Sequence, residues 1–446
     1  MSDKTTGTSG ATELRAAEPG PVKPAGRLKA DADLKQLMGK YYNGVFWAHR
    51  LHRPIAWITS GAPVEPLYAM GITPVYPENY GAILGSRKCA VEYCEIAEGA
   101  GYSRDLCSYA RGSIGSMMAD RGPLNGRGLP APDVLICAKN ICNVVVKWWE
   151  VMARHYNKPL FILDTPYVPE EPVKPHQLEF VRGQLEEMIA FLEKHTKRRL
   201  SRSRLVRVLE NSTKTVALWE EVQRYRQASP SPSSALDMFT NMAPIVAIRG
   251  TDACVKYYRK LADELKERAA HGVGPVPNER YRLVWDNIAI WHNFRLMKYF
   301  HERGAVFVGE TYTNAWGEYS FSPEDYKDPI MAMARQYSGV LLNVGPEVRL
   351  GRLLKMARDY RADGVVFHSN RSCKTYSLSQ YFLARGVQEQ LGLPTLFIEA
   401  DMTDPRAYAD AATKTRVDAF LEILEGRKEA GGVGATAGAG AGGRTC

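Results

Sequence analysis

Residues 133–149 read DVLICAKNICNVVVKWW. After Asp133, residues 134–138 (VLICA) form a short apolar run, which is typical of a strand buried on both faces of a sheet. A brief polar turn follows, and residues 142–149 then predict a helix. Strands that lead through short turns into helices are the repeating unit of parallel α/β sheets. The stretch therefore predicts an α/β fold and places Cys142 at the beginning of a helix.

Similar strands recur on both sides of this stretch and alternate with longer helical segments. One set covers residues 54–59, 73–76, 133–137 and 159–163, and a second covers residues 245–248, 305–308, 364–367 and 394–398. Residues 175–228 are rich in Glu, Lys, Arg and Leu and predict a helical connection between the sets. The predicted fold is α/β, with two Rossmann-like domains that contain parallel sheets, a helical connection and disordered termini.

A chain of 446 residues is too long for one ordinary hydrophobic core, so we expect more than one domain. Residues 1–27 are rich in Gly, Pro, Thr and Ala and predict a disordered segment. Residues 28–240 predict a first α/β domain with a helical extension, and residues 241–425 a second α/β domain. Residues 426–446 predict a flexible tail rich in Gly and Ala.

The composition is that of a soluble globular protein, with 45% hydrophobic and 24% charged residues. No apolar run reaches the roughly 18 residues that a membrane span needs. The first ten residues contain no apolar segment typical of a secretory signal, so we expect a cytoplasmic protein. The net charge is +9, and apart from a basic cluster at residues 197–204 the basic residues are scattered along the chain. This scatter disfavours nucleic-acid binding. A positive field of this kind suits an anionic substrate such as a coenzyme A ester, or an acidic redox partner.

Three of the eight cysteines occupy the same kind of position, where a polar turn leads into a helix. Cys107 is predicted just inside a helix capped by Ser103. Cys142 begins the helix described above, and Cys373 follows the strand and turn GVVFHSNRS of residues 364–372. The helix after Cys373 is predicted to run to about Leu391.

A thiolate in the first turn of a helix faces free backbone N–H groups, which lower its pKa and favour metal ligation. The shared placement therefore indicates one iron–sulfur cluster held between the two halves. The alternative is three unrelated buried thiols. No Cys-x-x-Cys pair occurs, so the common zinc and ferredoxin patterns are absent. The remaining five cysteines are not expected to be ligands. Cys89 and Cys94 are expected in the core or next to the ligands, Cys137 and Cys254 in the packed core, and Cys446 in the tail.

Polar residues gather after several of the predicted strands, at residues 60–61, 77–80 and 310–314. In open parallel sheets ligands bind in the crevice beyond the carboxyl ends of the strands. The same class of position holds Cys142 and Cys373. A crevice between two such domains is therefore the expected site.

Several short motifs now carry a family resemblance. They are SGAPVE at 60–65, PENY at 77–80, LCSY at 106–109, NIC at 140–142, SC at 372–373, FIEAD at 397–401 and TRVDAF at 415–420. In order and spacing the chain resembles the 2-hydroxyacyl-CoA dehydratase and benzoyl-CoA reductase family, from about residue 40 to 425. The resemblance implies that Cys107, Cys142 and Cys373 hold one [4Fe–4S] cluster, with one iron open to a ligand other than cysteine.

The resemblance also implies partners. These are a second cluster-carrying subunit of the same family and a separate ATP-hydrolysing iron–sulfur activator, with reduced ferredoxin as the electron donor. No Gly-x-x-x-x-Gly-Lys-[Ser/Thr] loop occurs here, so ATP is expected on the partner.

Within the family the chain looks most like the larger cluster-carrying subunit of an ATP-dependent, class I benzoyl-CoA reductase, chiefly in the stretch from Arg53 to Cys89. That likeness implies an oxidoreductase that reduces the ring of an aryl-CoA to a cyclic dienoyl-CoA. Two alternatives stay open. One is a subunit of a 2-hydroxyacyl-CoA dehydratase, a lyase. The other is a non-catalytic scaffold subunit that carries a cluster.

Five further residues are candidates for contact with substrate. In a dehydratase-like relative a Ser and a Glu at matching positions lie near the substrate, which makes Ser60 and Glu78 candidate catalytic residues. Asn79 and Tyr80 are candidates for substrate binding beside them. The alternative for this segment is a turn that caps the next helix. Trp316 is a candidate wall of a flat apolar pocket for an aromatic ring.

Overall fold

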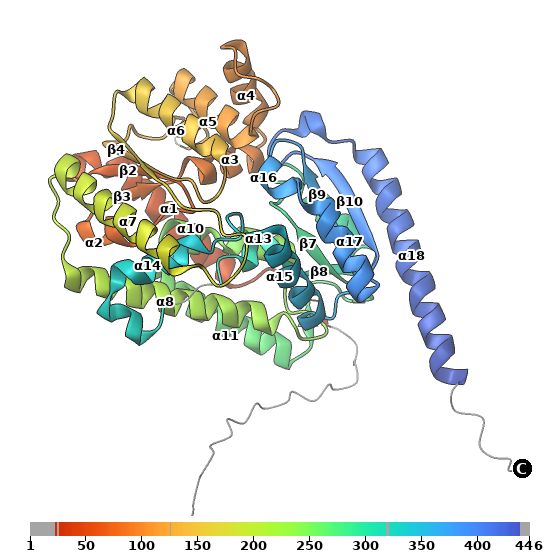
Figure 1. Cartoon of the computed structure of the whole chain (residues 1–446). Helices are drawn as coiled ribbons and strands as arrows, with labels where there is room; N and C mark the ends of the chain where they lie inside the picture. The colour runs from red at the N-terminus through yellow and green to blue at the C-terminus, as the bar shows by residue number, and fades with distance from the viewer. Residues whose placement is uncertain (1–22, 25, 125, 318–320, 438–446) are drawn as a thin grey trace, which may run out of the picture.

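The computed structural model describes residues 23–24, 26–124, 126–317 and 321–437. Within them, eight strands form two four-stranded sheets in which every pair is parallel. The strand orders are β3-β2-β4-β5 and β10-β9-β7-β8. Figure 1 shows the two sheets in separate parts of the molecule, each with helices around it. The α/β prediction with parallel sheets is confirmed.

The first sheet consists of β2 (Ile55–Ile58), β3 (Thr73–Val75), β4 (Val134–Ala138) and β5 (Leu160–Leu163). Successive side chains of a strand point to opposite faces of its sheet, so those of β4 pack alternately into two different cores. Leu135 and Cys137 pack in one core and Val134, Ile136 and Ala138 in another. The surrounding helices are α2 (Glu65–Met70), α3 (Pro77–Ser86), α4 (Ala90–Gly99), α5 (Ser108–Ala119) and α6 (Asn143–Tyr156).

The second sheet consists of β7 (Tyr281–Asp286), β8 (Ala305–Glu310), β9 (Gly364–Asn370) and β10 (Thr395–Ala400). The helices that follow β7 in the chain are α12 (Arg295–His301), α13 (Thr311–Asn314), α14 (Pro329–Ser338), α15 (Pro346–Asp359), α16 (Lys374–Ser377), α17 (Gln380–Leu391) and α18 (Asp410–Ala437). Of these, α14 packs mainly against α7 (Pro175–Thr196) of the first half. Short 3₁₀ turns are η1 (His49–Leu51), η2 (Pro323–Lys327) and η3 (Pro405–Ala407).

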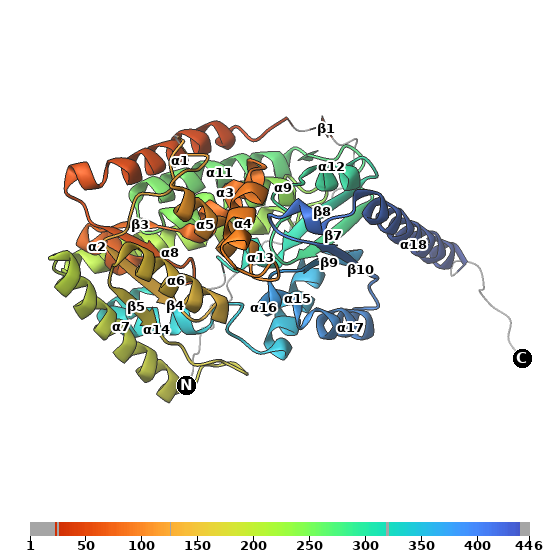
Figure 2. The ribbon, with the colours of Figure 1, turned by 90° about the horizontal axis from the view of Figure 1, so that it is seen from above.

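The predicted helical connection is observed as α7 and α8 (Arg202–Tyr225). It continues into α9 (Ala235–Asn241), α10 (Ala243–Ala247) and α11 (Asp252–Ala270), and α11 packs against α1 (Ala30–Trp47). Figure 2 shows α1 and α11 side by side on the face of the molecule away from α7. A small parallel pair, β1 (Lys23–Pro24) and β6 (Val273–Gly274), lies apart from the main sheets.

One predicted strand is wrong. Residues 245–248 lie in and just after α10, and the strand that the second sheet uses instead is β7. Pro244 occupies the first turn of α10, where a proline without an N–H is tolerated. A buried apolar run of four residues fits a strand or a helix equally well, so its pattern could not decide between them.

Three local predictions also need correction. Cys107 is the N-cap of α5, and Ser103 lies in the preceding turn, where its hydroxyl accepts from the N–H of Asp105 at 3.2 Å. The helix after Cys373 is interrupted between α16 and α17. The predicted flexible tail begins as part of α18, which continues to Ala437, whereas residues 438–446 lie outside the described residues. Of the predicted disordered segment, residues 1–22 and 25 also lie outside them.

None of the helices in the described ranges is long and apolar enough to cross a bilayer. The two halves meet through buried polar contacts as well as through a shared core. Arg111 of α5 forms ion pairs with Glu98 and, at 3.2 Å, with Asp404 from the second half. Ile288 and Met402 of the second half pack in the same core as Leu135 of the first.

Candidate functional site

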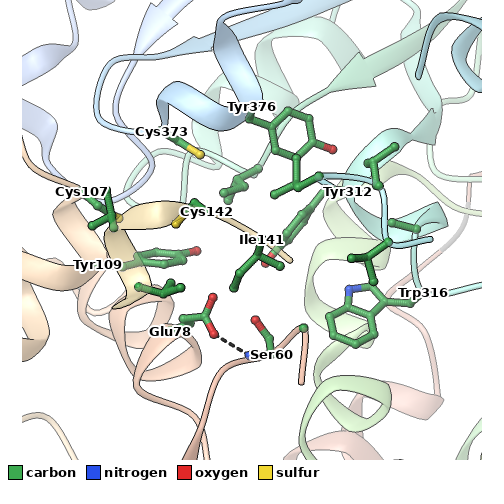
Figure 3. Close-up of a pocket in the computed structure, with 18 of the residues that line it drawn as sticks. Ser60, Glu78, Cys107, Tyr109, Ile141, Cys142, Tyr312, Trp316, Cys373 and Tyr376 are labelled. Carbon is green, nitrogen blue, oxygen red and sulfur yellow. Dashed lines mark hydrogen bonds between the residues drawn. The ribbon is translucent and has the colours of Figure 1, made fainter. Parts of the chain in front are cut away.

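A cavity of about 160 Å³ lies where the two halves meet, and it brings together the three predicted cysteine ligands. Cys107 and Cys142 come from the first half and Cys373 from the second. Figure 3 shows their sulfur atoms gathered on one side of the pocket, with Glu78 and Ser60 on the other. The structure therefore brings together side chains that are as much as 266 residues apart in sequence, from Cys107 to Cys373.

Each cysteine is the N-cap of a helix, and two of the helices follow a central strand. Cys142 lies between β4 and α6, and Cys373 lies between β9 and α16, while Cys107 precedes α5. The first backbone N–H groups of a helix have no partner within the helix. Those of Ala110, Val145 and Tyr376, three residues after each cysteine, act on the three thiols and favour the thiolate.

Burial nevertheless dominates the ionisation of these thiols. It raises the pKa of Cys142 to about 12 and of Cys373 to about 11, and it raises the pKa of Cys107 well above the ordinary value. The negative charges of Cys373 and Cys142 raise the pKa of Cys107 further. The N–H groups at the helix starts therefore lower the thiol pKa values as expected, but burial outweighs them and the net shift is upward. Three thiolates in one dry pocket need a cation to balance them.

A single metal ion does not fit this arrangement. Across the described parts of the chain, no three His, Cys, Asp or Glu side chains lie close enough to bind one ion. Zinc holds its sulfur ligands at about 2.3 Å, which forces the sulfur atoms close to one another. In an iron–sulfur cluster each cysteine binds a different iron, so the sulfur atoms stand farther apart. The described residues therefore contain no site for a single ion here, while three cysteines are ligands of the kind that iron–sulfur clusters take.

Glu78 and Ser60 form the polar side of the pocket. Glu78 lies in the first turn of α3, and its carboxylate accepts the backbone N–H of Ser60 at 2.5 Å. Burial raises the pKa of Glu78 to about 7, although the hydrogen bonds from Ser60 act to lower it. A carboxyl group with a pKa near neutrality can either donate or accept a proton under ordinary conditions.

The other three candidates are placed differently from one another. Trp316 lines the cysteine pocket, and the guanidinium of Arg249 lies 5.5 Å from the centre of its ring. Asn79 faces a second cavity behind the pocket. Tyr80 is 1% exposed, lines neither cavity, and its hydroxyl pairs with that of Ser116 at 2.8 Å. Tyr80 is thus placed in the packed interior of the first half rather than at either cavity, and its contact with substrate stays a prediction.

The pocket also contains residues that were not predicted from the sequence. Tyr109 and Tyr312 form a wall shared by both cavities. Tyr109 follows Cys107 by two residues, and Tyr312 lies in the polar segment after β8, so the sequence could have indicated both as pocket residues. No sequence pattern marks Arg249 as a pocket residue. It is held by Glu65 at 3.2 Å and by the hydroxyl of Tyr337 at 2.5 Å, deep in the first half.

Ser372 links two of the cysteine segments directly. Its hydroxyl accepts the backbone N–H of Ser108 at 3.1 Å and donates to the carboxylate of Asp401. Ser108 is the first residue of α5, so this N–H is one that the helix itself leaves unpaired. The side chain therefore holds the segment of Cys107 against that of Cys373 across the boundary between the two halves.

We expect Ser372→Ala to destabilise the chain by about 1–3 kcal/mol, because it leaves the buried N–H of Ser108 without a partner and removes one of the three hydrogen bonds to the Asp401 carboxylate. Chemical denaturation of the purified chain measures this difference. Ser372→Thr keeps the hydroxyl and should recover most of the loss. Ser369→Ala is the matched control, since the Ser369 hydroxyl makes no hydrogen bond within the described ranges. Equal stability of the Ser372→Ala and Ser369→Ala variants contradicts the bridging role.

Comparison with known proteins places these features in a family context. A sequence model of the family described as "2-hydroxyglutaryl-CoA dehydratase, D-component" matches residues 59–424. The match includes both sheets apart from β2, all three pocket cysteines, Ser60 and Glu78.

Individual relatives align over most of their length. The (R)-2-hydroxyisocaproyl-CoA dehydratase alpha subunit of Clostridioides difficile is 32% identical over 406 residues, which cover 90% of this chain and 98% of the relative. The (R)-phenyllactyl-CoA dehydratase alpha subunit of Clostridium sporogenes is 30% identical, with 90% and 97% covered. A benzoyl-CoA reductase subunit of Thauera aromatica is 32% identical over 378 residues, with 81% and 86% covered.

Proposed function

The chain belongs to the 2-hydroxyglutaryl-CoA dehydratase, D-component family, and from this premise we propose that it is the larger cluster-carrying subunit of an ATP-dependent benzoyl-CoA reductase. The reaction adds two electrons and two protons to the ring of benzoyl-CoA and yields a cyclic dienoyl-CoA. Relatives in this family include dehydratases and a reductase, all of them named for coenzyme A thioesters. The family alone therefore leaves the reaction type open.

The observation that carries the proposal is the position of three thiols in a pocket with aromatic walls. Besides Cys107, Cys142 and Cys373, the lining includes the rings of Tyr109, Trp148, Tyr312, Trp316, Tyr337 and Tyr376. Flat aromatic side chains favour a flat aromatic ligand through stacked and edge-to-face contacts. A ring held here lies within the same small cavity as the sulfur atoms.

The three cysteines would hold a [4Fe–4S] cluster that leaves one iron without a cysteine. Metal binding releases the thiol protons, which relieves the cost of burying three thiolates near one another. When bound, the cluster supplies single electrons, at a potential toward the low end of the roughly −700 to +450 mV that such clusters span. The apolar lining, with Ile141, Val144 and Leu341 among its members, limits the access of water to the sulfur atoms, whose protein donors are backbone N–H groups.

Glu78 is the residue to which we assign proton transfer. Its carboxyl lies in the pocket, and its pKa of about 7 keeps a substantial protonated fraction at neutral pH. The backbone N–H of Ser60 fixes the carboxylate at 2.5 Å, so the group points in a defined direction. Trp316 and Tyr312 orient the ring beside it.

Electrons must arrive from outside this chain. We propose a second cluster-carrying subunit of the same family and an ATP-hydrolysing iron–sulfur activator that is charged by reduced ferredoxin. The alpha and beta subunits of one relative, the (R)-phenyllactyl-CoA dehydratase of Clostridium sporogenes, both match this chain. That double match supports a sister subunit built from the same fold.

A dehydratase of a 2-hydroxyacyl-CoA is the second candidate. It is favoured by the alpha subunits that align over 97–98% of their length. It removes water from the substrate, with Glu78 as the base that accepts a substrate proton. No electron is consumed in the net reaction.

Electron consumption separates the two reactions. We expect the assembled enzyme, supplied with ATP, activator and a titrated reductant, to consume two electrons for each benzoyl-CoA converted. A matched incubation with a 2-hydroxyacyl-CoA should give no turnover. Many turnovers of the hydroxyacyl-CoA per electron supplied would instead establish the dehydratase.

A further inference from the structure

A second, larger cavity lies directly behind the cysteine pocket, with a volume of about 630 Å³. Its walls come from α1, α3, α9 and α10, together with Trp291 and Phe294. Tyr109 and Tyr312 line both cavities, and the indole N–H of Trp291 donates to the hydroxyl of Tyr109. The two cavities are therefore separated by little more than two tyrosine rings. Figure 2 labels α1, α3 and α9, three of the helices that contribute residues to the walls of the larger cavity.

The first turn of α3 serves both cavities. Glu78 lines the cysteine pocket and Asn79, the next residue, lines the larger cavity. The side-chain amide of Asn79 makes no hydrogen bond with any part of the chain that the structure describes. The other small polar side chains of the lining are satisfied within their own helices. Ser86 donates to the carbonyl of Ile83 and Thr240 donates to that of Leu236.

Size assigns different parts of a thioester to the two cavities. Pockets for small molecules usually measure about 300–1,000 Å³. The cysteine pocket, at about 160 Å³, is too small for a whole coenzyme A thioester and suits the acyl group. The cavity of about 630 Å³ has the size of a site for a much longer group.

The rim of the larger cavity carries positive charge. Arg27 and Lys35 line it, both are exposed, and neither forms an ion pair within the described ranges. Two carboxylates also line this cavity; both are less exposed than Arg27 and Lys35 and accept hydrogen bonds from neutral donors of the chain. Asp31 accepts from the side chain of Asn241 at 3.2 Å, and Asp237 accepts from the backbone of Ser234 at 2.8 Å. Cations at the mouth and an apolar interior with the Asn79 amide suit a ligand that is anionic at one end.

We propose that this second cavity binds the coenzyme A part of the thioester. Its phosphate groups lie at Arg27 and Lys35, its amide-containing arm runs along α3 past Asn79, and its thioester end reaches the cysteine pocket beside Tyr109 and Tyr312. The inference rests on the proposed function only in taking a coenzyme A thioester as the substrate. It is independent of whether the acyl group is reduced or dehydrated.

The test is the binding of coenzyme A itself, without an acyl group, to the assembled enzyme by titration calorimetry. We expect the double variant Arg27→Glu with Lys35→Glu to weaken binding roughly tenfold, because two favourable charge contacts become unfavourable. The double variant Lys40→Glu with Lys256→Glu is the control. It makes the same change in net charge at lysines outside the cavity lining. Its affinity should stay within twofold of the unaltered enzyme.

A truncated substrate provides a second measurement. The N-acetylcysteamine thioester of the same acyl group lacks the nucleotide, so the Arg27 and Lys35 reversals should leave its KM unchanged while they raise the KM of the coenzyme A thioester. Asn79→Ala should raise the KM of the coenzyme A thioester severalfold by removing the side-chain amide. Equal affinities in all variants, or equal weakening by the control pair, overturn the proposal.

The outcomes also separate this inference from the proposed function. If the rim reversals weaken coenzyme A binding but the enzyme does not reduce benzoyl-CoA, the cavity assignment stands and the reductase proposal fails. If benzoyl-CoA is reduced and the rim reversals leave coenzyme A binding unchanged, the reductase stands and the cavity assignment fails.

Discussion

Replacement of Cys142 by Ser should abolish turnover by the assembled enzyme and remove most of the iron bound to this chain. The reason is geometric, because Cys142 lies with Cys107 and Cys373 on one side of the pocket that Figure 3 shows. A serine oxygen is a poor substitute for thiolate as a ligand to iron–sulfur clusters. Iron and sulfide analysis of anaerobically purified protein, together with a rate measurement, checks the prediction.

Cys89→Ser is a closely matched control. Cys89 is also a half-buried N-cap, at the start of α4, but it lies outside the cysteine pocket and its thiol donates to the carbonyl of Leu84. We expect this variant to keep its iron and its rate. Full activity in a Cys142→Ser complex that has lost this iron would favour the scaffold alternative, in which the sister subunit performs the chemistry.

The sequence predicted the parts of the fold that repeat a strong local pattern. β4, Cys142 and α6 follow one another within 23 residues, and both the apolar strand and the amphipathic helix are visible there. Residues 245–248 failed because a run of four apolar residues carries no periodicity. The secondary structure of this run depends on its surroundings. It directly follows α9, and Pro244 suits the first turn of a helix.

The candidate site shows a different limit. The sequence brought Cys107, Cys142 and Cys373 together as residues of one type in one kind of position, but it could not tell neighbours apart within α3. Its residues 78–80 follow one another along the helix and therefore point in different directions, about 100° apart. As a result Glu78 faces the cysteine pocket, Asn79 faces the larger cavity, and Tyr80 packs inside the first half.

Long-range contacts were invisible for a related reason. Arg249 lines the pocket and is held there by bonds to Glu65 and Tyr337, which are 184 and 88 residues away in sequence. The sequence also predicted the N–H groups that lower the thiol pKa values but not the larger effect of burial, because the local pattern shows the helix and not the depth of burial. Burial raises the pKa of Cys142 to about 12 despite the N–H groups of α6.

Glu78→Gln should lower kcat by ~10²–10⁴-fold, the usual contribution of a general acid or base. Glutamine keeps the shape and can still accept from the backbone N–H of Ser60, so the pocket is preserved while the titrating proton is lost. Glu150→Gln is the control, because Glu150 is a carboxylate of α6 that pairs with Lys147 on the surface. Its rate should equal that of the unaltered enzyme.

The dependence of the rate on pH shows whether Glu78 acts as a general acid or as a general base. Burial raises the pKa of Glu78 from 4.5 to about 7, so the neutral acid predominates below pH 7 and the carboxylate above it. If Glu78 donates a proton to the ring, the rate should fall as the pH rises through 7, and Glu78→Gln should remove this limb. A rate that rises through pH 7 would instead make Glu78 a base and favour the dehydratase.

Stability offers a readout that is independent of turnover. Between pH 4.5 and 7 the folded chain retains the proton of Glu78 more tightly than the unfolded chain does. The free energy of unfolding of the unaltered protein should therefore fall, relative to that of Glu78→Gln, as the pH rises through this interval, and the difference should level off above pH 7. Parallel stability curves for the two proteins would show that Glu78 titrates normally, and the assignment of proton transfer to this residue would then lose its physical basis.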